Sequence, residues 1–260
     1  MRKWFTIVLL FLIPFSASAK VIETQHIEDI IPFIDDETWV LVDLDNCMFE
    51  GAQAFGHANW FYDLLQQKIA AGISREEAIR EIYPTWIEAQ EICRVKPLDS
   101  QFVPILVQLQ NKGLVIMGLT HRQLSVAEST SRQVASLGFN FLETAPTQES
   151  FKIPANQPAL YVNGILFVGD YNKKIDIFKL FLEKINKHPT KIVFIDDKRK
   201  NVDELEVLTK EGIVYTGIHY TAIDHVKPTY IREVAECQSK YFNQILSNEA
   251  AQLLIQHELD

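Results

Sequence analysis

The sequence predicts an α/β protein whose central parallel sheet is covered by helices on both faces. Four runs of mostly apolar, often β-branched residues are typical of buried strands: 38–43, 114–120, 191–197 and 212–218. Helical patterns separate these runs, as expected for right-handed crossovers between parallel strands. The composition agrees, because 47% of the 260 residues are hydrophobic and can fill a core.

The first 19 residues have the pattern of a secretory signal peptide. Arg2 and Lys3 precede the apolar stretch WFTIVLLFLIPF, and Ala17-Ser18-Ala19 forms a cleavage site before Lys20. The alternative is a membrane anchor, but the stretch is shorter than the roughly 20 residues that span a bilayer. We therefore expect residues 20–260 to form one exported domain, periplasmic or secreted, without a membrane span. Loss of Arg2 and Lys3 changes the net charge from −9 to −11, which argues against a nucleic-acid partner.

Local signals define the helices and one hairpin. Ser74 and Glu77 form a capping box, so the first helical segment contains two helices. Asn201 and Glu204 can cap the helix after the third strand. Asn163-Gly164 between short apolar runs predicts a tight hairpin at 161–167. We expect helices at 55–92, about 100–112, about 124–137, from about 172, after 197 and from about 229.

Polar side chains end three of the four predicted strands. Asp43, Thr120 and Asp196 each follow an apolar run, and the carboxyl ends of parallel strands meet at the edge where ligands bind. We expect these residues to share one crevice with Asp45, Asp197 and a lysine near 174.

Four carboxylates in one crevice require protonation or a cation. Two unit charges about 4 Å apart cost on the order of 4 kcal/mol near a protein surface. Oxygen ligands favour a hard cation, Mg²⁺ before zinc. With Mg²⁺ and a lysine present, a dianionic phosphate ester can bind and one carboxylate can attack phosphorus.

The order of these residues resembles the haloacid dehalogenase (HAD) superfamily. VLVDLDNCMF, LVIMGLT, YNKKIDIF and VFIDD resemble its four motifs in sequence, over residues 38–218. The resemblance implies a Rossmann-like parallel sheet with a small helical cap inserted after the first motif, at about 48–112. It also implies an exported Mg²⁺-dependent phosphatase that hydrolyses a small phosphomonoester.

The resemblance assigns a role to each residue. Asp43 is the expected nucleophile that forms an aspartyl-phosphate, and Asp45 is the general acid/base whose backbone carbonyl contacts Mg²⁺. Thr120 binds the phosphoryl group. Asp196 and Asp197 complete the metal site, with Asp197 preferred as a direct ligand.

The third-motif lysine has two candidates. Lys174 is preferred because Phe178 lies four residues on, at a core position, and Lys173 is the alternative. Arg122 either steers an anion or is a solvated residue at a helix start.

Several questions remain open at the level of sequence. Cys93 and Cys237 can form a disulfide, although three cysteines are not a disulfide framework. The aromatic residues of the 48–112 segment are expected mainly in a core, with one or two facing the substrate. A phosphotransferase, or an inactive exported binding module with a host-directed role, is an alternative function. The substrate and the oligomeric state are not predicted.

Overall fold

The structure is a computed structural model that describes residues 19–241 and 246–258. The predicted signal peptide lies outside the described residues except for Ala19, which begins the first strand.

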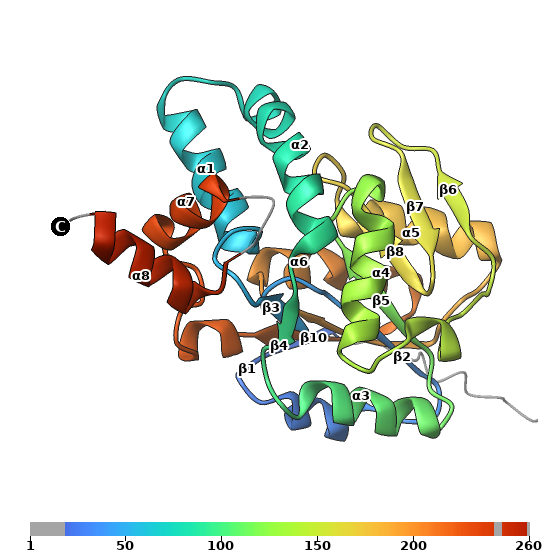
Figure 1. The fold of residues 1–260 in the computed structure, drawn as a ribbon. Coiled ribbons are helices and arrows are strands. Elements are labelled where there is room, and N and C mark those ends of the chain that lie inside the picture. The colour runs from blue at the N-terminus through green and yellow to red at the C-terminus, as the bar shows by residue number, and fades with distance from the viewer. Residues whose placement is uncertain (1–18, 242–245, 259–260) are drawn as a thin grey trace, which may run out of the picture.

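An eight-stranded sheet forms the centre of the molecule (Figure 1). From β1 to β8 in the spatial order the neighbouring strands are parallel, and β7 and β6 continue the sheet in antiparallel pairing. The strands in spatial order are β1 (Ala19–Thr24), β10 (Val214–Tyr220), β9 (Lys191–Asp196), β2 (Thr38–Val42), β5 (Ile116–Thr120), β8 (Ile165–Phe167), β7 (Ala159–Val162) and β6 (Phe151–Ile153).

Helices cover both faces of this sheet, because alternate strand residues point to opposite sides. Val40 and Val42 of β2 pack with α3 on one face, whereas Leu41 between them packs with α5 on the other. The α-helices are α1 (Ala58–Ala70), α2 (Arg75–Ile92), α3 (Phe102–Asn111), α4 (Ala127–Ser136), α5 (Lys174–Ile185), α6 (Arg199–Leu205), α7 (Arg232–Lys240) and α8 (Asn248–Glu258). Short 3₁₀ helices lie at Ile27–Phe33, Leu124–Val126, Phe141–Thr144, Glu206–Glu211 and Ala222–His225.

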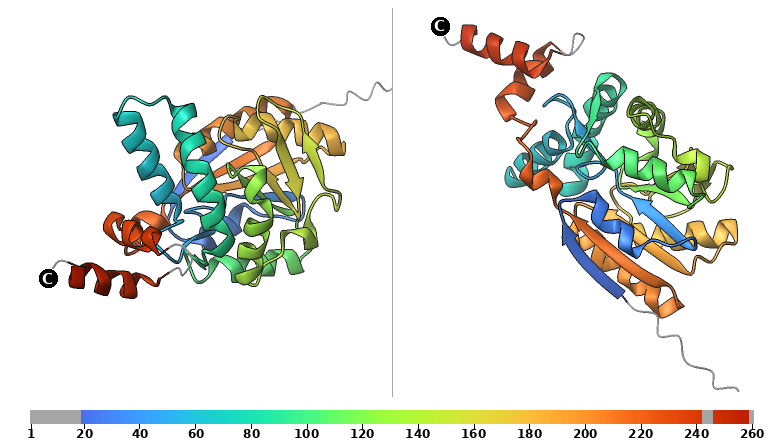
Figure 2. Two further views of the ribbon diagram at one scale, coloured as in Figure 1. Left: turned by 45° about the horizontal axis from the view of Figure 1, so that its top comes forward. Right: turned by 90° about the horizontal axis from the view of Figure 1, so that it is seen from below.

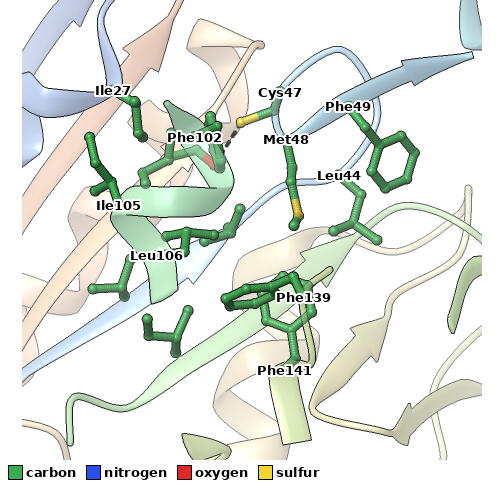
Figure 3. Packing of buried hydrophobic residues seen from close by; sticks show 14 of the residues in the cluster. Ile27, Leu44, Cys47, Met48, Phe49, Phe102, Ile105, Leu106, Phe139 and Phe141 are labelled. Atoms are coloured by element: carbon green, nitrogen blue, oxygen red, sulfur yellow. Dashed lines mark hydrogen bonds between the residues drawn. The ribbon is translucent and has the colours of Figure 1, made fainter. Parts of the chain in front are cut away.

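The segment after β2 turns sharply and returns to the core. Asn46 adopts a left-handed conformation, with φ of 60°. Cys47, Met48 and Phe49 are then fully buried and belong to the same hydrophobic cluster as Phe102. In Figure 3 the Cys47 side chain is directed toward Phe102, whereas the ring of Phe49 is directed away from it. The dashed line in that view joins the Cys47 thiol to the Ile195 carbonyl oxygen, 3.7 Å away. The buried residues 47–49 therefore fix the position of the chain directly after Asp43 and Asp45.

Helices α1 and α2 form a separate layer over the carboxyl ends of the strands. The short strands β3 (Phe49–Gly51) and β4 (Val95–Pro97) pair antiparallel and connect this layer to the sheet domain. A hydrophobic cluster joins α1 and α2 to α7 and α8, the C-terminal helices, which Figure 2 shows at the same end of the molecule.

The structure confirms the mixed α/β fold with a largely parallel sheet and all four predicted strands. The hairpin at Asn163-Gly164 is also confirmed, since β7 and β8 pair antiparallel on either side of it. Ser74 caps α2 as predicted, because its hydroxyl accepts from the Glu77 amide at 3.2 Å.

The predicted cap of α6 is wrong. Lys198 is the N-cap residue and makes no side-chain capping bond, whereas Asn201 donates to the Asp196 carboxylate. Both carboxylate oxygens accept from Asn201, so its amide serves the strand end rather than the helix start. Four further strands, β1, β3, β4 and β6, were not predicted from the sequence.

Candidate functional site

The candidate site lies where the order of strands in the sheet reverses. From β2 the chain proceeds to β5 and β8 on one side, then crosses back to β9 and β10 on the other. Ligands in open α/β sheets bind at such a point, beyond the carboxyl ends of the strands. Asp43, Thr120 and Asp196 stand at these ends, which is the convergence that the sequence predicts.

Lys174 joins two of the carboxylates. Its Nζ atom lies 2.6 Å from Asp43 Oδ1 and 2.6 Å from Asp196 Oδ2. Lys174 is only 1% exposed, whereas Lys173 is exposed to solvent. Burial works against the charge of Lys174, but the two carboxylates raise its pKa overall. Of the two candidate lysines, the structure therefore brings Lys174 to the site.

Asp43 has one occupied and one open carboxylate oxygen. Oδ1 accepts from Lys174, and among the described residues Oδ2 has no hydrogen-bond partner. The backbone amide of Asp43 donates to the Ile195 carbonyl at 2.9 Å, which fixes the residue to β9. Burial raises the pKa of Asp43, against the opposing charge of Lys174. A carboxylate in this position needs further positive charge to remain ionised.

Asp197 completes an acidic trio with Asp43 and Asp196. One carboxylate oxygen from each lies within 4.8 Å of the others, a spacing that can hold a metal ion. Asp197 Oδ1 is buried without a hydrogen-bond partner. Burial raises the pKa of Asp197 well above its usual range, and the charges of Asp43 and Asp196 add to this shift. Because the oxygen lacks a partner and the carboxylates repel one another, the trio suits a hard cation.

Asp45 is directed to Arg122 instead of to the trio. Arg122 donates from Nε to Asp45 Oδ2 and from Nη2 to Oδ1, each at 2.7 Å. Burial alone would raise the pKa of Asp45, but the charge and hydrogen bonds of Arg122 lower it overall. The side chain of Asp45 is therefore held as a carboxylate.

Arg122 is itself firmly held, so its interpretation as a solvated helix-start residue is wrong. Only 6% of its surface is exposed. Its Nη1 atom donates to Thr130 and Gln133, and the guanidinium group lies over the ring of Phe49, with its central carbon 5.2 Å from the ring centroid. The backbone amide of Arg122 donates to the Thr120 hydroxyl at 3.1 Å. This bond orients the side chain of Thr120 at the end of β5.

A pocket opens beside these residues, under α1 and α2. Four aromatic side chains of the helices line it: Phe61, Tyr62, Tyr83 and Trp86. We call these four the aromatic wall. On the sheet side the pocket is lined by Asp43, Asp45, Thr120, His121, Arg122, Asp170, Lys198 and Asn201. The aromatic residues of this segment thus serve both the core cluster and the pocket, and four line the pocket where one or two were expected.

Three polar residues of the pocket, His121, Asp170 and Lys198, were not predicted from the sequence. Lys198 donates to the Tyr62 hydroxyl at 2.5 Å and so connects α6 to α1. His121 directly follows β5, and Asp170 lies three positions after the end of β8. A weaker form of the signal that identified Asp43 marks Asp170, which follows the apolar run 165–168 after one glycine.

The cysteines are free thiols in the structure. Cys93 and Cys237, whose pairing the sequence left open, are both buried and unbridged, and so is Cys47. Burial raises the pKa of Cys47 well above its usual range, and the charges of Asp43, Asp196 and Asp197 add to the shift. The thiol beside the crevice is therefore kept protonated.

In the described part of the chain, no helix has both the length and the apolar character needed to cross a bilayer.

Relatives from species of Chlamydia and Rickettsia match most or all of the chain. A "putative outer membrane protein" of Chlamydia pneumoniae is 33% identical, covering 100% of this chain and 99% of the relative. A protein of the same description from Chlamydia muridarum is 32% identical over 94% of this chain and 93% of its own length. An uncharacterized protein of Rickettsia prowazekii is 23% identical over 90% of both chains. No solved structure matches the chain.

A family model overturns the HAD assignment. The model that matches residues 23–252 describes a "protein of unknown function (DUF2608)", and no relative named above is described as a haloacid dehalogenase. The four motifs are short, and a parallel sheet brings the residues at its strand ends together whatever the ancestry of the chain, so similar sites can arise independently. The extent of the family match and the identity to the chlamydial relatives show that the chain belongs to the DUF2608 family.

Proposed function

We propose that the protein is an exported Mg²⁺-dependent phosphomonoester hydrolase that acts through an aspartyl-phosphate on Asp43. One observation carries the proposal: Asp43 borders the pocket with one oxygen bound by Lys174 and the other open, beside two further carboxylates. This arrangement provides a nucleophile, a fixed cation and a place for a second cation.

The residues present fit a magnesium ion. Oxygen ligands from Asp43 and Asp197 are available, and the unpartnered Oδ1 of Asp197 is the sharpest sign of a missing positive charge. When bound, Mg²⁺ would supply positive charge that offsets the repulsion between the carboxylates and the phosphoryl oxygens. Asp196 is already held by Lys174, Asn201 and the Lys198 amide, so we assign it chiefly to orienting the site.

In the first half-reaction, Asp43 Oδ2 attacks phosphorus. A bond forms between this oxygen and phosphorus while the bond from phosphorus to the leaving alcohol breaks. Thr120 and Lys198 can donate hydrogen bonds to the phosphoryl oxygens. The charge of Lys174, together with that of a bound cation, would favour the ionised form of Asp43. The leaving oxygen takes up a proton from Asp45 or from solvent.

In the second half-reaction, water attacks the aspartyl-phosphate. Asp45 accepts a proton from the water, phosphate leaves and Asp43 is restored. This role requires the carboxylate form that Arg122 stabilises. Proton donation in the first half-reaction requires the acid form, which the same contact disfavours, so esters with good leaving groups should react faster.

Helices α1 and α2 suit the function of a cap. They place the aromatic wall over the pocket, and a covered site excludes bulk water from the nucleophile. In this proposal, the Rossmann-like sheet supplies the phosphate chemistry and the cap, inserted between β2 and β5, supplies contacts to the leaving group.

The test is phosphate release from a panel of phosphomonoesters by residues 20–260, with Mg²⁺ and with a chelator. We expect activity only with the metal. Asp43→Asn should lower kcat by about 1000-fold or more, equivalent to about 4 kcal/mol of the barrier, because an amide oxygen is a poor nucleophile.

Asp36→Asn provides the matched control, because Asp36 is exposed and lies outside the pocket. Full activity of Asp43→Asn would contradict the proposal. Added alcohols that appear as new phosphate esters would identify a phosphotransferase. Absence of Mg²⁺ binding in calorimetry, together with no turnover, would favour a binding module.

A further inference from the structure

We propose that the pocket binds the leaving alcohol through a subsite that selects a polyol, meaning a sugar or a ribose. The inference rests on the proposed function, because it concerns the part of the ester that leaves. The subsite lies between the aromatic wall and two hydrogen-bond acceptors, His121 and Asp170, which we call the acceptor pair.

The aromatic wall is a rigid apolar surface. The ring of Phe61 packs against Trp86 and Tyr83 in edge-to-face contacts, with centroids 5.2 Å and 6.1 Å apart. Phe61, Tyr83 and Trp86 are between 5% and 9% exposed. Such a surface accommodates the C–H face of a sugar ring with little loss of conformational entropy.

Two contacts hold the wall against the sheet domain. The Tyr83 hydroxyl accepts from the backbone amide of Gln123 at 3.2 Å, and the Tyr62 hydroxyl accepts from the Lys198 ammonium group. The wall therefore stands at a fixed distance from the strand ends, and from the residues that would bind the phosphoryl group.

Asp170 is a fixed acceptor at the end of β8. Its Oδ2 atom accepts from Gln123 Nε2 at 2.7 Å, and no other side chain of the described residues donates to its carboxylate. No described cation forms an ion pair with it within 4.0 Å. The second oxygen is thus available to a donor from the ligand.

His121 presents a second acceptor. Its Nδ1 atom lies 3.2 Å from the Gly169 carbonyl oxygen, which can only accept, so Nδ1 carries the proton. Burial, and then the charge of Lys174, lower the pKa of His121 to about 4, so the ring is neutral near pH 7. Nε2 then has a free lone pair, and no described residue donates to it.

This combination matches a polyol better than the other common leaving groups. Hydroxyl donors of a sugar satisfy both members of the acceptor pair while its C–H face packs on the wall. A phenol offers the apolar face without these donors. A cationic alcohol such as choline can pack its methyl groups on the wall, but in its phosphate ester it has no hydroxyl to donate to the acceptor pair.

The test compares kcat/KM of residues 20–260 for glucose 6-phosphate, uridine 5′-monophosphate, phenyl phosphate and phosphocholine, all with Mg²⁺. We expect Asp170→Asn to lower kcat/KM for the preferred polyol ester by about tenfold or more, mainly through KM. Hydrolysis of phenyl phosphate should change by less than about twofold. The two polyol esters distinguish a sugar from a ribose, and preference for either supports the subsite.

Two further variants keep the test decisive. His121→Asn retains a donor for Gly169 but loses the acceptor at Nε2, so it should show the same selective loss. Asp176→Asn, an exposed aspartate of α5, is the matched control and should change nothing. If folding of Asp170→Asn fails, affinity for the polyol ester is measured by calorimetry in Asp43→Asn with and without His121→Asn.

The outcomes separate the two proposals. Equal losses for phenyl phosphate and polyol esters, or no loss for either, would overturn the subsite and leave the phosphatase standing. Absence of hydrolysis with every ester would overturn the proposed function and the subsite with it.

Discussion

At the scale of single residues, Lys174 is the group on which the acidic site depends. It is 1% exposed and contacts Asp43 and Asp196, so replacing it by methionine leaves buried carboxylates without their cation. Breaking a buried ion pair by removing one partner costs about 3–5 kcal/mol. We expect Lys174→Met to lower the free energy of unfolding by that amount, measured by urea denaturation in the presence of a chelator.

The neighbouring lysine provides the control for this prediction. Lys173 is exposed and forms no ion pair within the described residues, so Lys173→Met should change the free energy of unfolding by less than about 0.5 kcal/mol. Equal effects of the two substitutions would show that the charge of Lys174 is not what stabilises the site.

His121 gives a residue-scale prediction about pH. Its pKa is lowered from 6.5 to about 4, so between these values the unfolded chain binds more protons than the folded protein. Stability therefore rises with pH across this window as far as His121 contributes. Relative to His121→Asn, the wild-type midpoint in urea should increase from pH 4 to pH 6.5 and then level off. His188→Asn, an exposed histidine, should leave the profile unchanged, and a His121→Asn profile parallel to wild type would contradict the assignment.

At the scale of elements, α6 is held close to β10 by a residue without a side chain. A Cβ atom on Gly217 would lie 2.3 Å from Val202 Cγ1 and 2.8 Å from the Tyr215 hydroxyl oxygen. Gly217→Ala must push α6 outward, and overpacking of this kind costs about 1–3 kcal/mol. Asn201 of the same helix donates to the Asp196 carboxylate. Gly217→Ala should therefore lower both the free energy of unfolding, measured in urea, and the phosphatase activity.

Gly118 of β5 is the comparison for this effect. A Cβ there would meet the Ile165 side chain at 3.1 Å, a contact that a side chain can relieve more easily. Gly118→Ala should therefore cost less than Gly217→Ala. The reverse order would mean that the packing of α6 on β10 is looser than these distances indicate.

The sequence predicts elements well where one local pattern decides them. Apolar runs that end in Asp43, Thr120 and Asp196 define strands β2, β5 and β9. A strand that is buried on both faces is apolar at nearly every position, so its residues do not alternate between apolar and polar. The same reasoning brought the strand-end residues together in one site. The Asn163-Gly164 hairpin was equally local, since φ is positive at both residues.

Elements and contacts that depend on distant partners were not predictable in this way. Strand β1 is identified by its pairing with β10, nearly 200 positions away, and it begins at the last residue of the expected signal peptide. Arg122 could not be assigned because its charged partner, Asp45, lies 77 positions away in the chain. The local pattern places Asn201 at a helix cap. Its side-chain amide instead donates to the Asp196 carboxylate, because a charged group is a stronger hydrogen-bond acceptor than a neutral one.

At the scale of the whole molecule, three hydrophobic clusters divide the core. Two lie on the opposite faces of the sheet, and the third joins α1 and α2 to the C-terminal helices. Gln238 of α7 is fully buried and links the parts of this third cluster. Its Oε1 atom accepts from the Phe55 amide at 2.8 Å, and its Nε2 atom donates to the Leu246 carbonyl at 2.7 Å. The C-terminal helices therefore hold the segment that leads into α1.

This division predicts that the cap helices open separately from the sheet. Gln238→Leu removes the acceptor of the Phe55 amide, and a buried group that loses its partner costs about 1–3 kcal/mol. Hydrogen exchange followed by mass spectrometry should show amides of α1 and α2 exchanging about tenfold faster or more, with β2, β5 and β9 unchanged. Gln66→Leu, at an exposed position of α1, should leave both regions as in wild type. Faster exchange in the central strands to the same degree would show that the third cluster and the sheet unfold as one cooperative unit, and that the aromatic wall cannot move without them.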